Sequence, residues 1–374
     1  MLKSIVSTAL MLCMFGMTAQ ATGSELLDIK AADGYVLEGK LDMPETKPER
    51  LVIFVNGSGP NTYDNRRQIN GQNFNYFDLF AEQITADGNA FFRWNTRGCT
   101  PGDEPPLFTD ISEPDYQTYV PENSIADVEA VISGLRDDER LSDCPVILLG
   151  WSEGTMIAPQ VAARGNVPVD ALVLCGYVNG TMAEALEWQQ TGGASMVFYR
   201  EYFDTDGDGA ISASEYNADP YGIVKALGDV PFESLDLDGS GILTEEDFKL
   251  MLADSWSQLQ DAIARGDDQW LAENYSVRLT SAWFEGHARL QPNREILPKL
   301  NIPIHIFHGT SDGNVPVQGV YDIEASFQEA GKDNLTIHVY PNHDHDLNYT
   351  QYILTGELSE GFKDLFELLA HELS

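Results

Sequence analysis

The apolar residues of the chain fall into short continuous runs that alternate with stretches of helical spacing. Continuous apolar runs are typical of strands buried on both faces of a sheet, and apolar residues three and four positions apart predict amphipathic helices. In the first half the strand-like runs are 51–55, 89–95, 145–149 and 171–178, and the helix-like stretches are 77–86, 125–136 and 154–165. This alternation predicts a mostly parallel α/β sheet covered by helices on both faces.

The same alternation returns near the C-terminus, with strand-like and helix-like stretches in turn at 302–309, 320–331, 335–340 and 361–373. An antiparallel pair of strands, turning at Asp33 and Gly34, is expected to open the sheet. Ser124 is a candidate N-cap for the helix over 125–136. Between the two halves, residues 179–298 are helix-like and rich in acidic and aromatic residues. We therefore expect one core from 22–178 and 299–374, interrupted by a helical insertion.

The N-terminus has the pattern of an export signal. Lys3 precedes an apolar stretch over 5–17, and Ala19-Gln20-Ala21 fits a cleavage site, so residues 1–21 are predicted to be removed. The stretch is too short for a comfortable membrane span and no other apolar run reaches its length. The sequence therefore predicts a protein exported to the periplasm or outside the cell, without stable membrane insertion.

The composition narrows the possible partners. The chain has 374 residues, of which 59 are acidic and 22 basic, giving a formal net charge of −37. So large an acidic excess argues against nucleic acid and anionic lipid as partners, because both require a basic surface. After removal of the signal, Cys99, Cys144 and Cys175 remain, and an odd number leaves at least one thiol outside any intrachain disulfide.

A serine occupies the turn between a predicted strand and a predicted helix, in Gly150-Trp151-Ser152-Glu153-Gly154. Such a turn exposes the serine oxygen at the carboxyl end of the sheet, and the flanking glycines allow strand and helix to pack closely. A serine becomes a good nucleophile only beside a base that a third group orients. Ser152 is therefore the candidate nucleophile of a hydrolase.

Partners for this serine follow later strands in the expected order. Asp312 comes after the strand over 302–309, and His343 and His345 come after the strand over 335–340. The backbone N–H of Glu153, with that of Ser58 or Gly57 in the loop after 51–55, would hold the oxyanion. From spacing alone, either histidine could be the base.

These motifs resemble the α/β-hydrolase superfamily, over about 25–178 and 299–374. The resemblance is greatest to a branch of bacterial serine esterases and S9/S33-like peptidases with GSGP at 57–60, R-x-x-x-RG at 93–98, SEG at 152–154 and D…VP at 312–316. It implies a triad of Ser152, Asp312 and His345, since Pro341 to His345 has the family's P-x-x-x-H spacing, and an ester, thioester or amide substrate. The chain departs from many relatives at Asn56, where they carry histidine.

The insertion contains two acidic loops with the spacing of calcium ligands. The segment over 204–215 fits D-x-D-x-D-G-x5-E, and the segment over 236–247 repeats the pattern with a final aspartate. Calcium takes six to eight oxygen ligands, which one such loop supplies. The candidate ligands are Asp204, Asp206, Asp208, Ala210, Ser212 and Glu215 in the first loop, and Asp236, Asp238, Ser240, Ile242, Thr244 and Asp247 in the second.

Both loops resemble EF-hands, and the pair, over about 194–255, implies a calcium-binding module within a cap over the active site. The leading interpretation is an exported carboxylesterase with a cap that is stabilised by bound calcium. A peptidase or thioesterase of the same fold, and a calcium-binding interaction protein with an inactive core, are the alternatives. Six aromatic residues of the insertion are candidates for an acyl pocket, although aromatics more often fill cores: Trp188, Tyr199, Tyr202, Trp256, Trp270 and Trp283.

Overall fold

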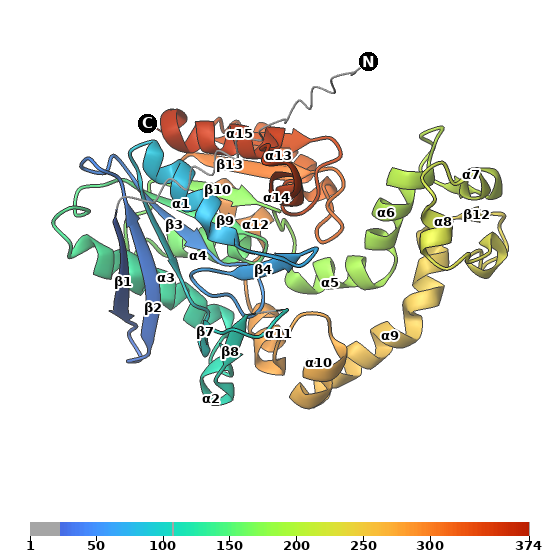
Figure 1. Cartoon of the computed structure of the whole chain (residues 1–374), viewed down its shortest axis with the longest axis horizontal. Helices are drawn as coiled ribbons and strands as arrows, with labels where there is room; N and C mark the ends of the chain where they lie inside the picture. Colours follow the sequence, from blue (N-terminus) through green and yellow to red (C-terminus); the bar gives the residue numbers. More distant parts are fainter. Residues whose placement is uncertain (1–22, 107, 374) are drawn as a thin grey trace, which may run out of the picture.

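The core of the protein is an eight-stranded sheet, seen in a computed structural model that describes residues 23–106 and 108–373 (Figure 1). The predicted signal segment, 1–21, lies outside the described residues. The strands, in spatial order, are β1 (Gly23–Lys30), β2 (Val36–Met43), β6 (Ala90–Trp94), β3 (Leu51–Val55), β9 (Val146–Trp151), β10 (Ala171–Cys175), β13 (Ile304–Gly309) and β14 (Leu335–Tyr340).

Only the opening strand pair departs from parallel order. β1 pairs antiparallel with β2, and β2 pairs antiparallel with β6, whereas the six strands from β6 to β14 are parallel. The prediction of a mostly parallel sheet is confirmed. The order places the carboxyl ends of β3, β9, β13 and β14 on one edge, where ligands bind in open α/β sheets.

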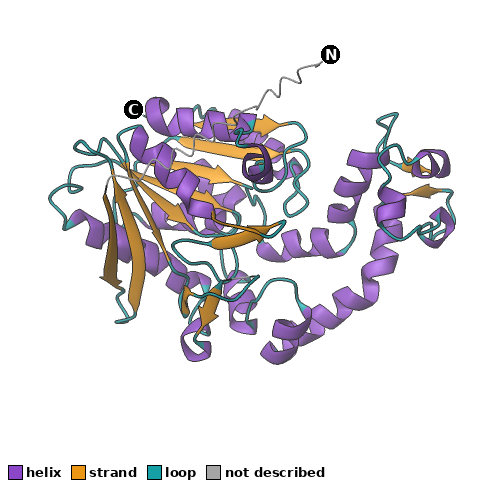
Figure 2. Cartoon of the chain, in the orientation of Figure 1, coloured by secondary structure: helices purple, strands orange, loops and turns teal. Residues whose placement is uncertain are grey.

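Helices cover both faces of the sheet (Figure 2). On one face, apolar side chains of α3 (Pro121–Arg136), α4 (Gly154–Arg164) and α13 (Gln318–Glu329) pack in one core cluster. On the other face, α1 (Tyr76–Ala86) and α15 (Glu360–Glu367) pack through rings such as Phe80 and Phe362. Burial of the sheet on both faces explains why its strands read as continuous apolar runs.

Some local predictions were wrong. The helix predicted from Ser124 begins at Pro121, whose fixed φ and missing N–H are compatible with a first helical position. Two segments without predicted strands contain small antiparallel hairpins. These are β4 (Arg66–Ile69) with β5 (Gln72–Asn75), and β7 (Cys99–Pro101) with β8 (Thr109–Ile111), which α2 (Glu113–Tyr116) follows.

The chain leaves the sheet after β10 and returns at β13, and the insertion lies between these two strands. Figure 1 shows the insertion reaching away from the sheet and coming back along α9. Its elements are α5 (Met182–Gln190), α6 (Gly193–Phe203), β11 (Ile211–Ser212), α7 (Ala213–Ala218), α8 (Ile223–Ala226), η1 (Phe232–Ser234), β12 (Ile242–Leu243), α9 (Glu245–Arg265), α10 (Asp268–Asn274), α11 (Ser281–His287), α12 (Asn293–Ile296) and η2 (Leu297–Lys299).

The two arginines of the R-x-x-x-RG motif are structural. Arg93 is buried and paired with Asp42, and burial lowers the pKa of its guanidinium to about 9. Arg97 donates to both carboxylate oxygens of Asp127 and to Asp33. The Arg93 pair joins β6 to β2, and the Arg97 pairs fix the segment after β6. Removing one partner of such a buried pair would leave an uncompensated charge.

The C-terminal part closes the fold with α14 (Tyr349–Thr355) and a π-helical turn, η3 (Leu368–Glu372), after α15. Cys99, Cys144 and Cys175 are buried and unpaired. Within 23–106 and 108–373, no helix is both long and apolar enough to span a membrane.

Candidate active site

Ser152 occupies a strained turn between β9 and α4. Its φ is 55°, a left-handed conformation that is rare for residues other than glycine. A Cβ on Gly154 would lie 2.0 Å from the Val55 carbonyl oxygen, and one on Gly150 would lie 2.5 Å from the Gly154 carbonyl oxygen. Both positions therefore require glycine, as the sequence predicted, and the close packing they allow holds Ser152 in its strained conformation.

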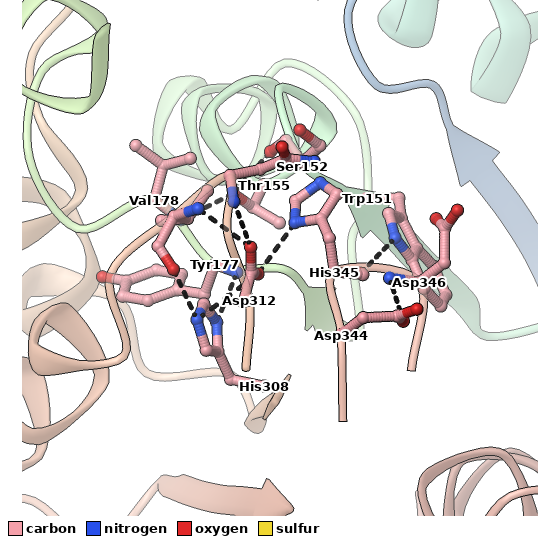
Figure 3. Close-up of polar contacts among 12 residues, drawn as sticks. Trp151, Ser152, Thr155, Tyr177, Val178, His308, Asp312, Asp344, His345 and Asp346 are labelled. Carbon is pink, nitrogen blue, oxygen red and sulfur yellow. Dashed lines mark hydrogen bonds and ion pairs between the residues drawn. The ribbon is translucent and has the colours of Figure 1, made fainter. Parts of the chain in front are cut away.

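Asp312 and His345 meet beside this turn (Figure 3). His345 Nδ1–H donates to Asp312 Oδ2 over 2.8 Å, and Asp312 Oδ1 accepts from the backbone N–H groups of Asn314 and Val315 at 2.7 and 2.9 Å. His345 and Ser152 line the same cavity, although the Ser152 hydroxyl makes no hydrogen bond to His345 among the described residues. Catalytic hydrogen bonds are often loose in free enzymes and tighten with substrate.

The surroundings of His345 favour its protonated form. Burial lowers the pKa of the imidazole, but the Asp312 carboxylate and the charges of Asp346 and Asp344 outweigh burial and raise this pKa to about 9. Asp312 itself is buried, which raises its pKa, but the neighbouring His345 dominates and the pKa of Asp312 is lowered. The pair therefore carries opposite charges at neutral pH.

This pKa predicts an alkaline pH profile. A general base must be neutral, so kcat/KM for hydrolysis should rise with pH and level off above a midpoint near 9. Asp346→Asn should move the midpoint down by up to about one unit, because it removes a charge that stabilises the imidazolium. Glu329→Gln, which removes an exposed charge at the end of α13, is the control. A midpoint near 6.5 in the native chain, or the same shift in both variants, would contradict the assignment.

His343, the alternative base, has both ring nitrogens engaged in backbone contacts. Its Nδ1–H donates to the Pro341 carbonyl at 3.0 Å, and its Nε2 accepts from the Gly361 N–H at 3.4 Å. The structure places His345, and not His343, against Asp312. His343 instead ties the loop after β14 to the start of α15.

A third histidine, His308, was not predicted. It is fully buried on β13, its Nδ1 accepts from the Tyr177 N–H at 3.1 Å, and its Nε2–H donates to the Val315 carbonyl at 3.1 Å. Burial lowers its pKa, so it stays neutral beside Asp312. His308 thus fixes the loop that carries Asp312. The only sequence signal was its position at the end of a strand, four residues before that aspartate.

The predicted oxyanion loop lies directly against the nucleophile. A Cβ on Gly57 would be 3.2 Å from the Ser152 Cβ, and Ser58 lines the cavity with Ser152. Glu153 occupies the N-cap position of α4, and backbone N–H groups at a helix N-terminus lack helical partners. Asn56, the departure from the family pattern, donates from Nδ2 to the Trp94 carbonyl at 3.0 Å. Both predicted segments are therefore near Ser152.

A cavity of roughly 300 Å³ opens above Ser152 and His345. Apolar residues of the insertion and of the loop after β13 form one wall: Met182, Ala185, Leu186, Leu279, Trp283 and Val315. Polar residues of the core form another: Asn61, Asn65, Arg67 and Asp346. Of the six aromatic residues predicted as candidates, Trp283 lines this cavity, whereas Tyr199 packs beside the acidic loops. The cavity suits a substrate with an apolar and a polar part.

The two acidic loops lie at the end of the insertion that is farthest from the sheet (Figure 1). Ile211 pairs with Leu243 in a short antiparallel contact between β11 and β12 that joins them. Carboxylate oxygens of Asp204, Asp206 and Asp208 gather within 4.8 Å of one another.

In the second loop, Asp236, Asp238 and Asp247 gather within the same distance. The carboxylate of Asp247 lies close to those of Asp236 and Asp238, although the aspartate side chain is shorter than that of glutamate. In the first loop, Glu215 instead accepts hydrogen bonds from Thr205 and Ser212, which hold its pKa near 2.

The sheet order, the serine turn and the acid and histidine after later strands define the class of hydrolases built on a doubly covered parallel sheet. A family model described as "Alpha/beta hydrolase family" matches residues 52–352. The chain belongs to the α/β-hydrolase family. No curated protein matches.

Solved structures show the same fold at low identity. A thermostable carboxyl esterase from Bacillus coagulans is 16% identical, with a TM-score of 0.55 over 94% of this chain and 99% of that one. The acylaminoacyl peptidase of Pyrococcus horikoshii is 11% identical, with a TM-score of 0.50 over 93% of this chain and 40% of that one. At such identity the likeness concerns the fold alone.

Proposed function

We propose that the chain is an exported serine hydrolase that cleaves carboxylic esters through an acyl-enzyme. The main support for this proposal is that the strained Ser152 turn and the Asp312–His345 pair lie at the same cavity. Membership in the α/β-hydrolase family supports hydrolysis as the reaction, and the esterase among the structural neighbours supports esters as the substrate.

The proposed reaction has two halves. Neutral His345 takes the Ser152 proton as the serine oxygen attacks the ester carbonyl, and the N–H groups of Glu153 and of Ser58 or Gly57 stabilise the oxyanion. His345 then gives its proton to the leaving alcohol, and an acyl group remains on Ser152. Water, deprotonated by His345, attacks that acyl group and releases the carboxylic acid and Ser152.

We also propose that the acidic loops hold calcium and that calcium stabilises the insertion. In each loop three carboxylates lie close enough to share an ion. Asp236 Oδ1 is buried and has no hydrogen-bond partner, as expected for an oxygen that coordinates a cation. Bound calcium would supply positive charge to these loops and would take no direct part in the chemistry at Ser152.

The signal-like N-terminus supports export to the periplasm or the extracellular space, where calcium is abundant. A peptidase is the second candidate, because an acylaminoacyl peptidase shares the fold. The present chain spans about 40% of that protein, however.

The proposed ester specificity is tested by comparing p-nitrophenyl butyrate with aminoacyl p-nitroanilides at pH 9 in calcium. We expect kcat/KM to be at least tenfold higher for the ester, because the apolar wall of the cavity, which includes Met182 and Leu186, would receive the butyryl chain. A preference for the anilides would favour a peptidase, and no turnover of either would favour an inactive core.

A further inference from the structure

The residue after the nucleophile has a buried carboxylate. The Glu153 side chain is 1% exposed, although the reaction develops negative charge at the adjacent oxyanion site. Glutamate is rarely this buried unless its oxygens are fully hydrogen-bonded. The proposed mechanism uses only the backbone N–H of Glu153, so the side chain requires a separate explanation.

Three donors converge on this carboxylate. Trp283 Nε1–H and His287 Nε2–H both donate to Oε1, over 3.0 and 2.8 Å, and the Tyr119 hydroxyl donates to Oε2. All three donors are themselves at least nine-tenths buried. Trp283 and His287 lie one turn apart on α11, so one face of this insertion helix is fixed to Glu153.

The same residue carries a catalytic N–H. Ser152 has its strained φ of 55°, and Glu153 is the N-cap of α4. Anchoring the Glu153 side chain at both oxygens restricts the backbone of Glu153, and this backbone sets the direction of its N–H. Trp283 also lines the cavity, so the contact joins the substrate wall to the serine turn.

We propose that Glu153 is a positioning residue whose carboxylate fixes the serine turn to α11, so that its own N–H points at the oxyanion. This role rests on the proposed serine mechanism. The helix α11 of the insertion is then part of the catalytic apparatus, because its residues Trp283 and His287 hold the turn that carries Ser152.

The test compares Glu153→Ala with Glu153→Gln. Glutamine keeps the shape of the side chain and can keep its three hydrogen bonds. Its oxygen would accept from both α11 donors, and its NH2 group would donate to the Tyr119 oxygen. We expect Glu153→Ala to lower kcat by about 100-fold with KM changed less than about threefold, as for loss of one oxyanion donor. Glu153→Gln should recover kcat to within about tenfold of the native value. Affinity for a trifluoromethyl ketone, whose adduct carries an oxyanion, should fall in parallel with kcat.

Two further variants separate positioning from general destabilisation. Trp283→Phe removes a single donor and should lower kcat about five- to tenfold, which keeps the test usable if Glu153→Ala does not fold. Asp127→Asn alters another buried carboxylate, bound to Arg97, and should lower the melting temperature with kcat unchanged.

The outcomes of these experiments distinguish the positioning role of Glu153 from the serine mechanism on which it rests. An active native chain with Glu153→Ala or Trp283→Phe at native kcat would overturn the positioning role and leave the serine mechanism standing. Equal changes of kcat in the Glu153 variants and Asp127→Asn would also overturn it. A native chain with no turnover would overturn both.

Discussion

Ser152→Ala is expected to lower kcat for p-nitrophenyl butyrate by about a million-fold, the size of effect seen when a serine protease loses its nucleophile. The Ser152 hydroxyl lies at the turn that faces His345 and the cavity, where we propose that it forms the acyl-enzyme. Alanine fits the same strained backbone, so the fold and the melting temperature should change little.

The matched control is Ser133→Ala, which removes an exposed hydroxyl on α3 that bonds only to the Glu129 carbonyl. Its kcat should equal that of the native chain. Activity within about tenfold of native in Ser152→Ala would assign the chemistry to another residue, since the remaining site supplies only binding and oxyanion stabilisation.

Removal of calcium is expected to lower the melting temperature by about 5–10 °C. A ligand at 100 times its Kd stabilises the folded state by about 2.7 kcal/mol, and each kcal/mol shifts the melting temperature of a domain of 150–250 residues by about 2–4 °C. Without an ion, the clustered aspartates of each loop repel one another. Melting curves by circular dichroism, in calcium and in chelator, measure the shift.

Activity should fall with calcium removal and return with calcium. The helix α9 begins at the second loop, and its residues Leu259 and Ala262 pack in the same cluster as Trp283 and Met182, which line the cavity. Loosening α9 therefore disturbs the apolar wall of the site. Equal activity with and without chelator would make the loops peripheral to catalysis.

Substitutions test whether the effect of calcium depends on the two loops or on other acidic residues of the surface. Asp206→Ala combined with Asp238→Ala should abolish the difference between calcium and chelator, because each loop loses one of its three clustered carboxylates. Glu201→Gln, an exposed acid just before the first loop, should keep the full difference. An identical melting temperature of the native chain in calcium and chelator would contradict calcium binding altogether.

Sequence patterns were sufficient where local chemistry decides the structure. Buried strands such as 51–55 appear as continuous apolar runs, and the Ser152 turn is visible because two glycines are required by close contacts to Val55 and to Gly154. Asp312, His343 and His345 became candidates because parallel strands bring their carboxyl ends to one edge, and the resemblance to the family favoured His345.

Contacts between distant segments could not be predicted in this way. No local pattern shows that Glu153 meets Trp283 and His287, which lie 130 and 134 residues later. His308 gave no sign of its link to Tyr177, because both its hydrogen bonds are to backbone groups. The start of α3 was misplaced because a cap-like Ser124 was preferred to Pro121, although both residue types favour helix N-termini.

The most direct test of the central claim is labelling of the native chain with a fluorophosphonate, followed by mass spectrometry of its peptides. Only an activated serine reacts with this probe, so one adduct per chain should form, on the peptide that contains Ser152. His345→Ala should slow labelling by several orders of magnitude. An adduct on another residue, or no adduct in the native folded chain, would contradict the proposal that Ser152 is the nucleophile.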